Sequence, residues 1–207
     1  MGKHWKVFNI GINDADYQVS PVGWKCPYYS RWKDMLRRCY DMKYKQKFTT
    51  YNDCSVCVSW LIFSNFKAWM ETQDWGGKEL DKDLLFRGNK IYSPDTCVFI
   101  DKGVNYFTTE STATQGKCMI GVHIEKSSGK FKAQIQNPFT NKREFLGRFD
   151  SEILAHLAWK TRKHQIACKL AESQTDERVK NALLTRYSEK AESSVEFADA
   201  LIKQWEK

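Results

Sequence analysis

The chain has 207 residues, 42% of them hydrophobic and 14% aromatic, which is enough apolar surface for one or two cores and excludes a wholly disordered protein. Its longest stretch without a charged residue, Cys54–Phe66, has 13 residues, whereas a membrane-spanning helix needs about 20 mostly apolar residues. No apolar signal core of about 7 to 15 residues follows the N-terminal Met. The sequence therefore predicts no membrane association and a cytoplasmic location.

The net charge of +8 is unevenly spread along the chain. Residues 1–110 carry 16 basic and 13 acidic side chains, residues 111–172 carry 11 and 5, and residues 173–207 carry 6 and 7. Most of the excess positive charge therefore lies in the middle segment. A field of that sign favours polyanions such as nucleic acids.

A Thr-, Ser- and Gly-rich stretch at residues 108–116 lacks apolar periodicity and is the expected linker. It divides the chain into segments with different charge and different hydrophobic patterns. We therefore predict an α+β protein with a first domain at residues 1–110, a second domain at residues 111–172 and an amphipathic C-terminal helix at residues 173–207.

The first domain shows a mixed pattern of helices and strands. Ser30 is expected to cap a helix over residues 31–41, where apolar side chains recur every three or four positions. A second helix is expected after Ser64. Residues 80–100 are expected to form a strand, a turn at Gly88-Asn89 and a returning strand.

Three ordered blocks of this domain resemble the phage-borne HNH-type homing endonucleases: Tyr29–Tyr40, Val56–Phe66, and Leu80–Asp83 with Gly88-Asn89 and Tyr92–Cys97. The resemblance implies a small ββα-metal nuclease domain. In that family an Asp and a later Asn or His hold a divalent ion at the scissile phosphate, and a His beside the Asp activates water. Asp81 matches the metal-binding Asp, whereas Lys82 stands in place of the His and Thr96 stands near the late Asn. A phage-encoded protein of this kind would act in the host bacterial cytoplasm.

No histidine can act as the base within this motif, because the four His residues are His4, His123, His156 and His164. In one interpretation, Asp81, Asp83 and Asn89 still gather Mg²⁺ or Mn²⁺, the metal lowers the pKa of a bound water, and Lys82 orients that water or neutralises phosphate. In the other interpretation, Asp81 and Asp83 are solvated charges beside a Gly88-Asn89 turn, and the nuclease fold is a binding scaffold.

Seven cysteines in a chain without an export signal predict reduced thiols, buried or metal-bound, in place of disulfides. Cys54 and Cys57 have the spacing that lets two thiolates share a Zn²⁺ ion, with Cys39 and Cys97 as further ligands. The alternative is that these are small buried hydrophobic residues, since Cys39 falls on the apolar face of its predicted helix and Cys97 precedes Val98-Phe99.

The second domain predicts three antiparallel strands, over residues 119–124, 129–138 and 142–149, followed by a helix capped by Asp150 or Ser151. Alternation in the middle strand makes one face apolar and the other basic and rich in amides. The apolar positions are Phe131, Ala133 and Ile135, and the polar ones are Lys130, Lys132, Gln134 and Gln136. A three-stranded sheet packed on one helix is therefore expected.

The segment Ile120–Leu170 resembles the plant-type ethylene-response (APETALA) DNA-binding domain, which also occurs in phage homing endonucleases. The resemblance rests on Ile120-Gly121-Val122, Gly129-Lys130-Phe131, Ala133 with Ile135, Asn137-Pro138, and Leu146-Gly147 with Phe149. It implies that the exposed sheet face enters the major groove of double-stranded DNA through Lys132, Gln134, Gln136, Arg143 and Phe145. The chemistry of the side chains supports the same partner, because Gln can pair with adenine and Arg with guanine, while Lys130, Lys142 and Arg148 can neutralise phosphates.

The last 35 residues show an apolar stripe at helical spacing: Val179, Leu183, Tyr187, Ala191, Val195, Ala198, Ile202 and Trp205. The stripe is expected either to fold back on the domains or to pair with another chain, in a homodimer or with a protein partner. Together these features predict a phage-type DNA-binding protein acting as a metal-dependent HNH-like endonuclease with an altered active site. The alternative is a non-catalytic DNA- or protein-binding factor, a regulator or host-defence antagonist, on a nuclease-derived scaffold.

Overall fold

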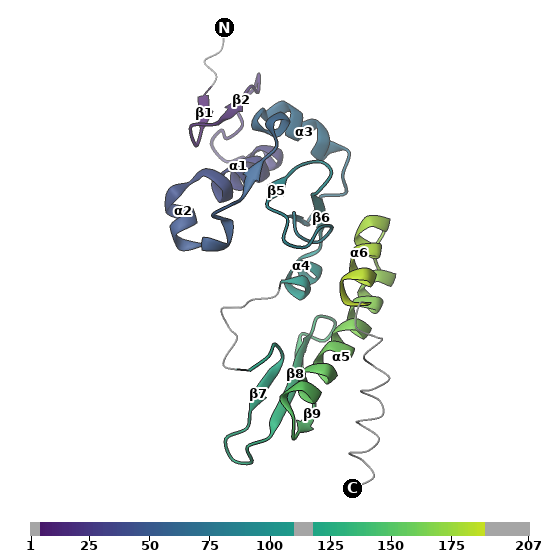
Figure 1. Ribbon diagram of the computed structural model, residues 1–207. Helices are drawn as coiled ribbons and strands as arrows, with labels where there is room; N and C mark the ends of the chain where they lie inside the picture. Colours follow the sequence, from purple (N-terminus) through teal and green to yellow (C-terminus); the bar gives the residue numbers. More distant parts are fainter. Residues whose placement is uncertain (1–4, 110–117, 189–207) are drawn as a thin grey trace. The chain divides into compact units, whose positions relative to one another are not determined.

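The computed structural model describes residues 5–109 and 118–188. The chain divides into two compact units, Met1–Lys102 and Gly103–Lys207, and each is described by itself (Figure 1). Both units combine helices with small sheets, which agrees with the mixed class predicted from the sequence. Within the described ranges, no helix is both long enough and apolar enough to cross a membrane.

Unit 1 consists of short strands and helices. Its elements are β1 (Trp5–Val7), β2 (Gly11–Asn13), α1 (Pro27–Tyr40), α2 (Met42–Lys47), β3 (Ser55–Val56), α3 (Phe63–Glu71), β4 (Glu79–Asp81), β5 (Ile91–Tyr92) and β6 (Val98–Ile100), with 3-10 turns at Thr49–Tyr51 and Val58–Leu61. Strands β1 and β2 pair antiparallel, as do β4 and β6, whereas β3 and β5 pair parallel. The strand, turn and returning strand expected over residues 80–100 therefore correspond to β4 and β6.

Helix α1 begins earlier than the sequence predicts. Pro27 occupies its first turn, where a residue without an N–H leaves no donor unsatisfied, and Cys26 stands at the N-cap. The prediction that Ser30 caps this helix is wrong, because the Ser30 hydroxyl donates to the Cys26 carbonyl from within the first turn. The helix ends before Asp41, whose carboxylate caps α2 by accepting from the amides of Lys43 and Tyr44.

Aromatic side chains are the largest buried groups of the unit 1 core. Trp32, Trp60 and Phe66 are almost completely buried, and the indole of Trp32 donates to the Trp60 carbonyl at 2.7 Å. At Gly11 of β2 an added Cβ would lie 2.3 Å from the Leu36 side chain, so glycine lets this strand approach α1 closely. The apolar face predicted for α1 is thus the face that packs inward.

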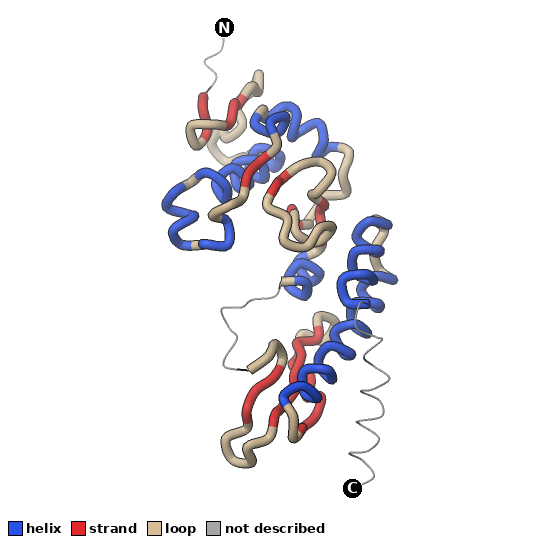
Figure 2. The backbone as a smooth tube through the Cα atoms, in the orientation of Figure 1, coloured by secondary structure: helices blue, strands red, loops and turns tan. Residues whose placement is uncertain are grey.

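Unit 2 begins with α4 (Lys102–Thr108) and continues through β7 (Val122–Ile124), β8 (Phe131–Asn137), β9 (Lys142–Phe149), α5 (Glu152–Glu172) and α6 (Glu177–Ser188). The strands form one antiparallel sheet in the order β7-β8-β9, and α5 runs along one of its faces (Figure 2). The three strands and the following helix agree with the sequence prediction. The predicted linker lies mostly outside the described residues, and the division between the units falls after Lys102, the first residue of α4.

The sheet and α5 pack through small and apolar side chains. Val122, Ala133, Phe149 and Ala155 form a buried cluster between them. Gly121 precedes β7 with a φ of +81°, and an added Cβ there would lie 2.1 Å from the Trp159 ring on α5. Only glycine therefore fits at the point where the chain enters the sheet.

Helices α4, α5 and α6 surround the buried side chain of Lys163. Its ammonium lies 3.8 Å from the ring centre of Phe107 and 5.5 Å from that of Tyr187, and it also donates to the Phe107 carbonyl. Val179 and Leu183 of α6 are buried as well, and α6 packs against α5. For this part of the apolar stripe, the fold-back interpretation is confirmed.

The C-terminal helix predicted over residues 173–207 is interrupted at its start. Residues 173–176 leave the helical conformation between α5 and α6. The stripe positions from Ala191 onward, together with the partner interface expected there, lie outside the described residues.

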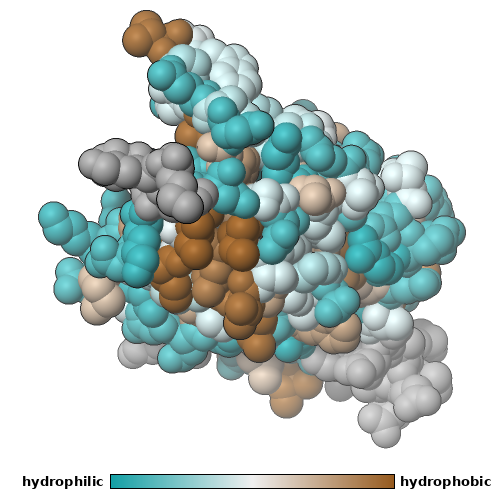
Figure 3. All heavy atoms as spheres, turned by 90° about the horizontal axis from the view of Figure 1, so that it is seen from above, coloured by the Kyte–Doolittle hydropathy of each residue, from teal (hydrophilic) through white to brown (hydrophobic). Residues whose placement is uncertain are grey.

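Several large hydrophobic side chains of unit 1 remain exposed. Seen from above, hydrophobic atoms form a visible area within a largely hydrophilic surface (Figure 3). The exposed hydrophobic residues of this unit are Ile12, Tyr17, Val22, Trp24, Met42, Phe48, Val58, Phe86 and Ile91. Exposed apolar atoms are common on protein surfaces, so these residues do not by themselves mark a binding site.

Candidate functional site

The sheet of unit 2 places the predicted DNA-contacting side chains on one face. In β8, Ala133 and Ile135 are buried toward α5, and Lys132, Gln134 and Gln136 alternate with them on the opposite face. The register sets Lys132 opposite Arg148, Gln134 opposite Phe145, and Gln136 opposite Arg143. The exposed face of β8 and β9, defined here as these six residues, therefore gathers all but one of the side chains singled out from the sequence.

A β-bulge makes this arrangement possible. Phe145 and Arg148 are three positions apart, so a regular strand would place them on opposite faces. The register shifts at Ala133/Gln134, and Gly147 of β9 adopts a φ of +138° there. The extra residue returns Arg148 to the face that carries Phe145 and Arg143.

Two cations lie beside the exposed ring of Phe145. The Lys132 ammonium is 5.4 Å and the Arg148 guanidinium carbon 5.2 Å from the ring centre. Phe145 as a residue is 53% exposed. An aromatic side chain beside two cations presents both apolar and charged groups to a ligand.

Two of the predicted phosphate contacts are already paired within the protein. Arg148 forms an ion pair with Glu125, and Lys130 forms one with Asp150 at 3.2 Å. Glu125 is not among the residues predicted from the sequence to form the site. An available signal was that it is one of only five acidic residues in the basic segment 111–172.

A third ion pair lies on the α5 side of the sheet. Glu144 accepts from Nε of Arg162 at 2.7 Å and also accepts from Asn137. These bonds lower the pKa of Glu144 to about 2, with the Arg162 bond as the largest cause. The pair links β9 to α5 and so fixes which face of the strand remains exposed.

The candidate catalytic residues of unit 1 also lie together, in the turn that follows β4. Lys82 is buried, and its ammonium donates to both carboxylate oxygens of Asp83, at 2.8 and 2.7 Å, and to the Asn89 carbonyl at 2.8 Å. The Asn89 side-chain amide donates back to the carbonyls of Lys82 and Ile91. We call this set, Asp81, Lys82, Asp83 and Asn89, the Lys82 turn.

Asp81 closes the start of the turn. One of its carboxylate oxygens accepts from the backbone amides of Asp83 at 2.8 Å and Leu84 at 2.6 Å. Burial raises the pKa of Asp81 above its ordinary value, although those two amide bonds oppose the shift. The turn is therefore held by its own side chains, and Lys82 is a structural hydrogen-bond donor within it.

The donor set of the Lys82 turn does not fit a Mg²⁺ or Mn²⁺ ion in this arrangement. Both oxygens of Asp83 accept from the Lys82 ammonium, so a metal ion bound by Asp83 would lie beside a second positive charge, and one oxygen of Asp81 is held by two backbone amides. Across residues 5–109 and 118–188, no group of three or more His, Cys, Asp or Glu side chains is placed to share an ion.

The four cysteines considered as zinc ligands belong to the core of unit 1 or pack against it. Cys39, Cys54 and Cys97 are buried, and Cys57 lies 3.3 Å from the Ser59 hydroxyl. Burial raises the pKa of Cys39 and of Cys97 to about 12, so both carry protons at neutral pH. Their environment is typical of small hydrophobic core residues.

Comparisons with known proteins give no family assignment. No family model, curated protein or solved structure matches the chain.

Proposed function

We propose that this protein binds double-stranded DNA through the exposed face of β8 and β9. The observation that supports this most strongly is the shared orientation of Lys132, Gln134, Gln136, Arg143, Phe145 and Arg148 on one solvent-facing surface. Gln and Arg side chains can bond two atoms of a base edge at once. Lys side chains neutralise phosphates without reading sequence.

The support from α5 suits this role. The helix covers only the opposite face, and the Glu144–Arg162 pair keeps β9 against it. The exposed face is therefore a two-stranded surface with polar side chains on adjacent strands. The major groove, about 12 Å wide, admits a surface of that kind.

For unit 1, we propose a structural role for the Lys82 turn within a non-catalytic DNA-binding factor. Metal-dependent phosphodiester cleavage is the second candidate, because Asp81, Lys82, Asp83 and Asn89 do lie in one turn. In that case Asp83 would have to release Lys82 before binding Mg²⁺. Any Mg²⁺ or Mn²⁺ requirement belongs to this second candidate.

The DNA-binding proposal is tested by the salt dependence of duplex binding by the full chain. Between about 50 and 200 mM salt, the dissociation constant should rise steeply, since phosphate contacts release counterions. Lys132→Gln should lower the slope of log K against log salt by about 0.9. The matched control is Lys90→Gln in unit 1, which should leave the slope unchanged. Binding that is insensitive to salt, or equally affected by both variants, would contradict the proposal.

Plasmid nicking separates the two roles for unit 1. Supercoiled plasmid is incubated with the full chain in Mg²⁺, Mn²⁺ or chelator, for wild type and Asp81→Ala. We expect no nicking beyond the chelator control. Nicking that requires the metal and is lost in Asp81→Ala, with duplex binding retained, would establish the endonuclease instead.

A further inference from the structure

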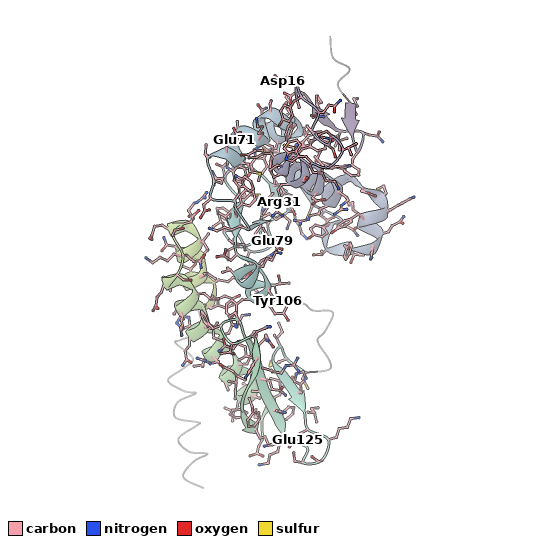
Figure 4. The ribbon with its side chains drawn as sticks, turned by 180° about the vertical axis from the view of Figure 1, so that it is seen from behind. Asp16, Arg31, Glu71, Glu79, Tyr106 and Glu125 are labelled. Atoms are coloured by element: carbon pink, nitrogen blue, oxygen red, sulfur yellow. The ribbon has the colours of Figure 1, made fainter. Side chains whose placement is uncertain are left out.

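Arg148 extends across the exposed face toward the opposite edge of the sheet. It belongs to β9, whereas Glu125 follows β7, the other outer strand, at the hairpin that leads into β8 (Figure 4). Nε of Arg148 donates to both oxygens of Glu125, at 3.0 and 2.9 Å, and Nη2 donates to one of them at 2.9 Å. The guanidinium group therefore lies over the middle strand, beside Lys132, and not at the rim of the sheet.

Other contacts hold this pair in place. The Ser128 hydroxyl donates to Glu125 at 2.7 Å from within the hairpin turn. The guanidinium also contacts the ring of Phe145 on its own strand. The bonds from Arg148 and Ser128 lower the pKa of Glu125 to about 2, so the pair is fully charged at neutral pH. An Arg held in this way loses less side-chain freedom when it binds a ligand.

The remaining hydrogens of Arg148 suit a base more than a phosphate. The guanidinium has five N–H donors, and Glu125 occupies those on Nε and one on Nη2. The edge formed by Nη1 and Nη2 keeps donors that match O6 and N7 of guanine. Because Glu125 neutralises the positive charge, the attraction of Arg148 to phosphates is weakened while its directional donors remain.

We propose that Arg148, positioned by Glu125, reads a guanine in the major groove of the bound DNA. Glu125 acts as a positioning residue and makes no contact with the DNA itself. This inference rests on the proposed duplex binding and adds the base that the sheet selects. It also changes the role expected for Arg148 from the sequence, where it was assigned to phosphate neutralisation.

The test is selection of binding sites from a randomised duplex library by the full chain. Wild type should select a motif with a strongly preferred guanine. Arg148→Ala should lower the preference for that guanine by about 5- to 150-fold and leave the rest of the motif unchanged. Glu125→Gln, which keeps the side-chain size, should weaken the same preference. It should also steepen the salt slope by up to about 0.9, because Arg148 becomes able to meet phosphates.

Arg178→Ala is the matched control, since Arg178 of α6 is also paired with a carboxylate, that of Asp176, and lies outside the sheet. It should leave the motif unchanged, and circular dichroism should show that every variant is folded. Equal loss of affinity for all sequences in Arg148→Ala would overturn the inference, as would an unchanged guanine preference in Glu125→Gln. Wild-type binding without sequence preference would overturn it too, but would leave the proposed function standing. Absence of binding to any duplex would instead refute the proposed function itself.

Discussion

The Lys82 turn and the exposed face of β8 and β9 both gather charged and amide side chains, but the two regions orient these side chains differently. In the turn, the Lys82 ammonium bonds Asp83 and Asn89, and the groups satisfy one another within nine residues. On the sheet, Lys132 and Gln134 alternate with buried neighbours and face solvent. Clustering of polar residues is therefore a weak sign of a site. A stronger sign of a binding site is a set of hydrogen-bond donors that the fold orients toward solvent on one face.

The largest expected effect comes from removing the support behind the exposed face. Leu183 of α6 is fully buried, so Leu183→Ala should destabilise unit 2 by about 2 to 5 kcal/mol through the cavity it leaves. Asn181→Ala, at an exposed position of the same helix, should cost less than about 0.5 kcal/mol. Denaturant unfolding followed by hydrogen exchange of the sheet amides measures both. Equal effects would mean that α6 does not stabilise the sheet unit.

Because α6 packs on α5, a fragment of unit 2 needs α6 in order to fold. A piece ending at residue 172 would expose the face of α5 that covers Val179 and Leu183. Residues 111–172, the domain predicted from the sequence, therefore lack helices that the structure assigns to unit 2.

The next effect tests whether the Lys82 turn is held from within. Lys82→Met keeps an unbranched chain but removes the ammonium, leaving Asp83 and the Asn89 carbonyl without their donor. We expect a loss of about 2 to 4 kcal/mol in unit 1, less than for a fully buried ion pair because Asp83 is half exposed. Tryptophan fluorescence during denaturant unfolding reports mainly on this unit, which holds six of the eight tryptophans. Lys90→Met, an exposed neighbour, should cost under about 1 kcal/mol, and similar losses in both variants would disprove the prediction.

The smallest effect concerns pH, where the two regions should respond with opposite sign. The pKa of Glu144 falls from 4.5 to about 2 on folding. Its contribution to the stability of the folded state is therefore fully present above pH 4.5 and is lost as the pH falls toward 2. Burial raises the pKa of Asp81 above 3.8, so the folded state binds a proton at this carboxyl group more tightly than the unfolded state does. The stability of the folded state therefore falls as the pH rises above 3.8.

Unfolding curves for wild type, Glu144→Gln and Asp81→Asn between pH 2 and 7 check this difference. The advantage of wild type over Glu144→Gln should shrink as the pH falls. The stability of wild type relative to Asp81→Asn should instead rise as the pH falls. The same trend in both comparisons would show that one of the two carboxyl groups is misassigned.

The sheet of unit 2 could be predicted because period-two alternation in β8 is a local property of the sequence. The bulge in β9 could not, since it depends on the backbone conformation of Gly147 and on pairing with β8. Glu125 was missed for a related reason. Its partner Arg148 is 23 positions away, and nothing in the intervening sequence indicates that the two meet.

In unit 1 the helices α1 and α3 followed from apolar spacing, but β3 and β5 did not, because two residues show no period. The Lys82 turn was recognised as a cluster of chemically capable residues. Its hydrogen bonds were not predictable, because adjacency of Lys82 and Asp83 does not reveal that they bond each other and bury the ammonium.

The aromatic enclosure of Lys163 has a consequence for how unit 2 can be rearranged. Phe107 comes from α4 at the start of the unit and Tyr187 from the last described turn of α6, and their rings are 5.5 Å apart. Chain entry and the end of α6 therefore lie side by side. Modules whose ends adjoin can be spliced into a loop of another host or circularly permuted with little disturbance. The geometry of unit 2 therefore suits insertion of residues 103–188 into a loop of an unrelated protein.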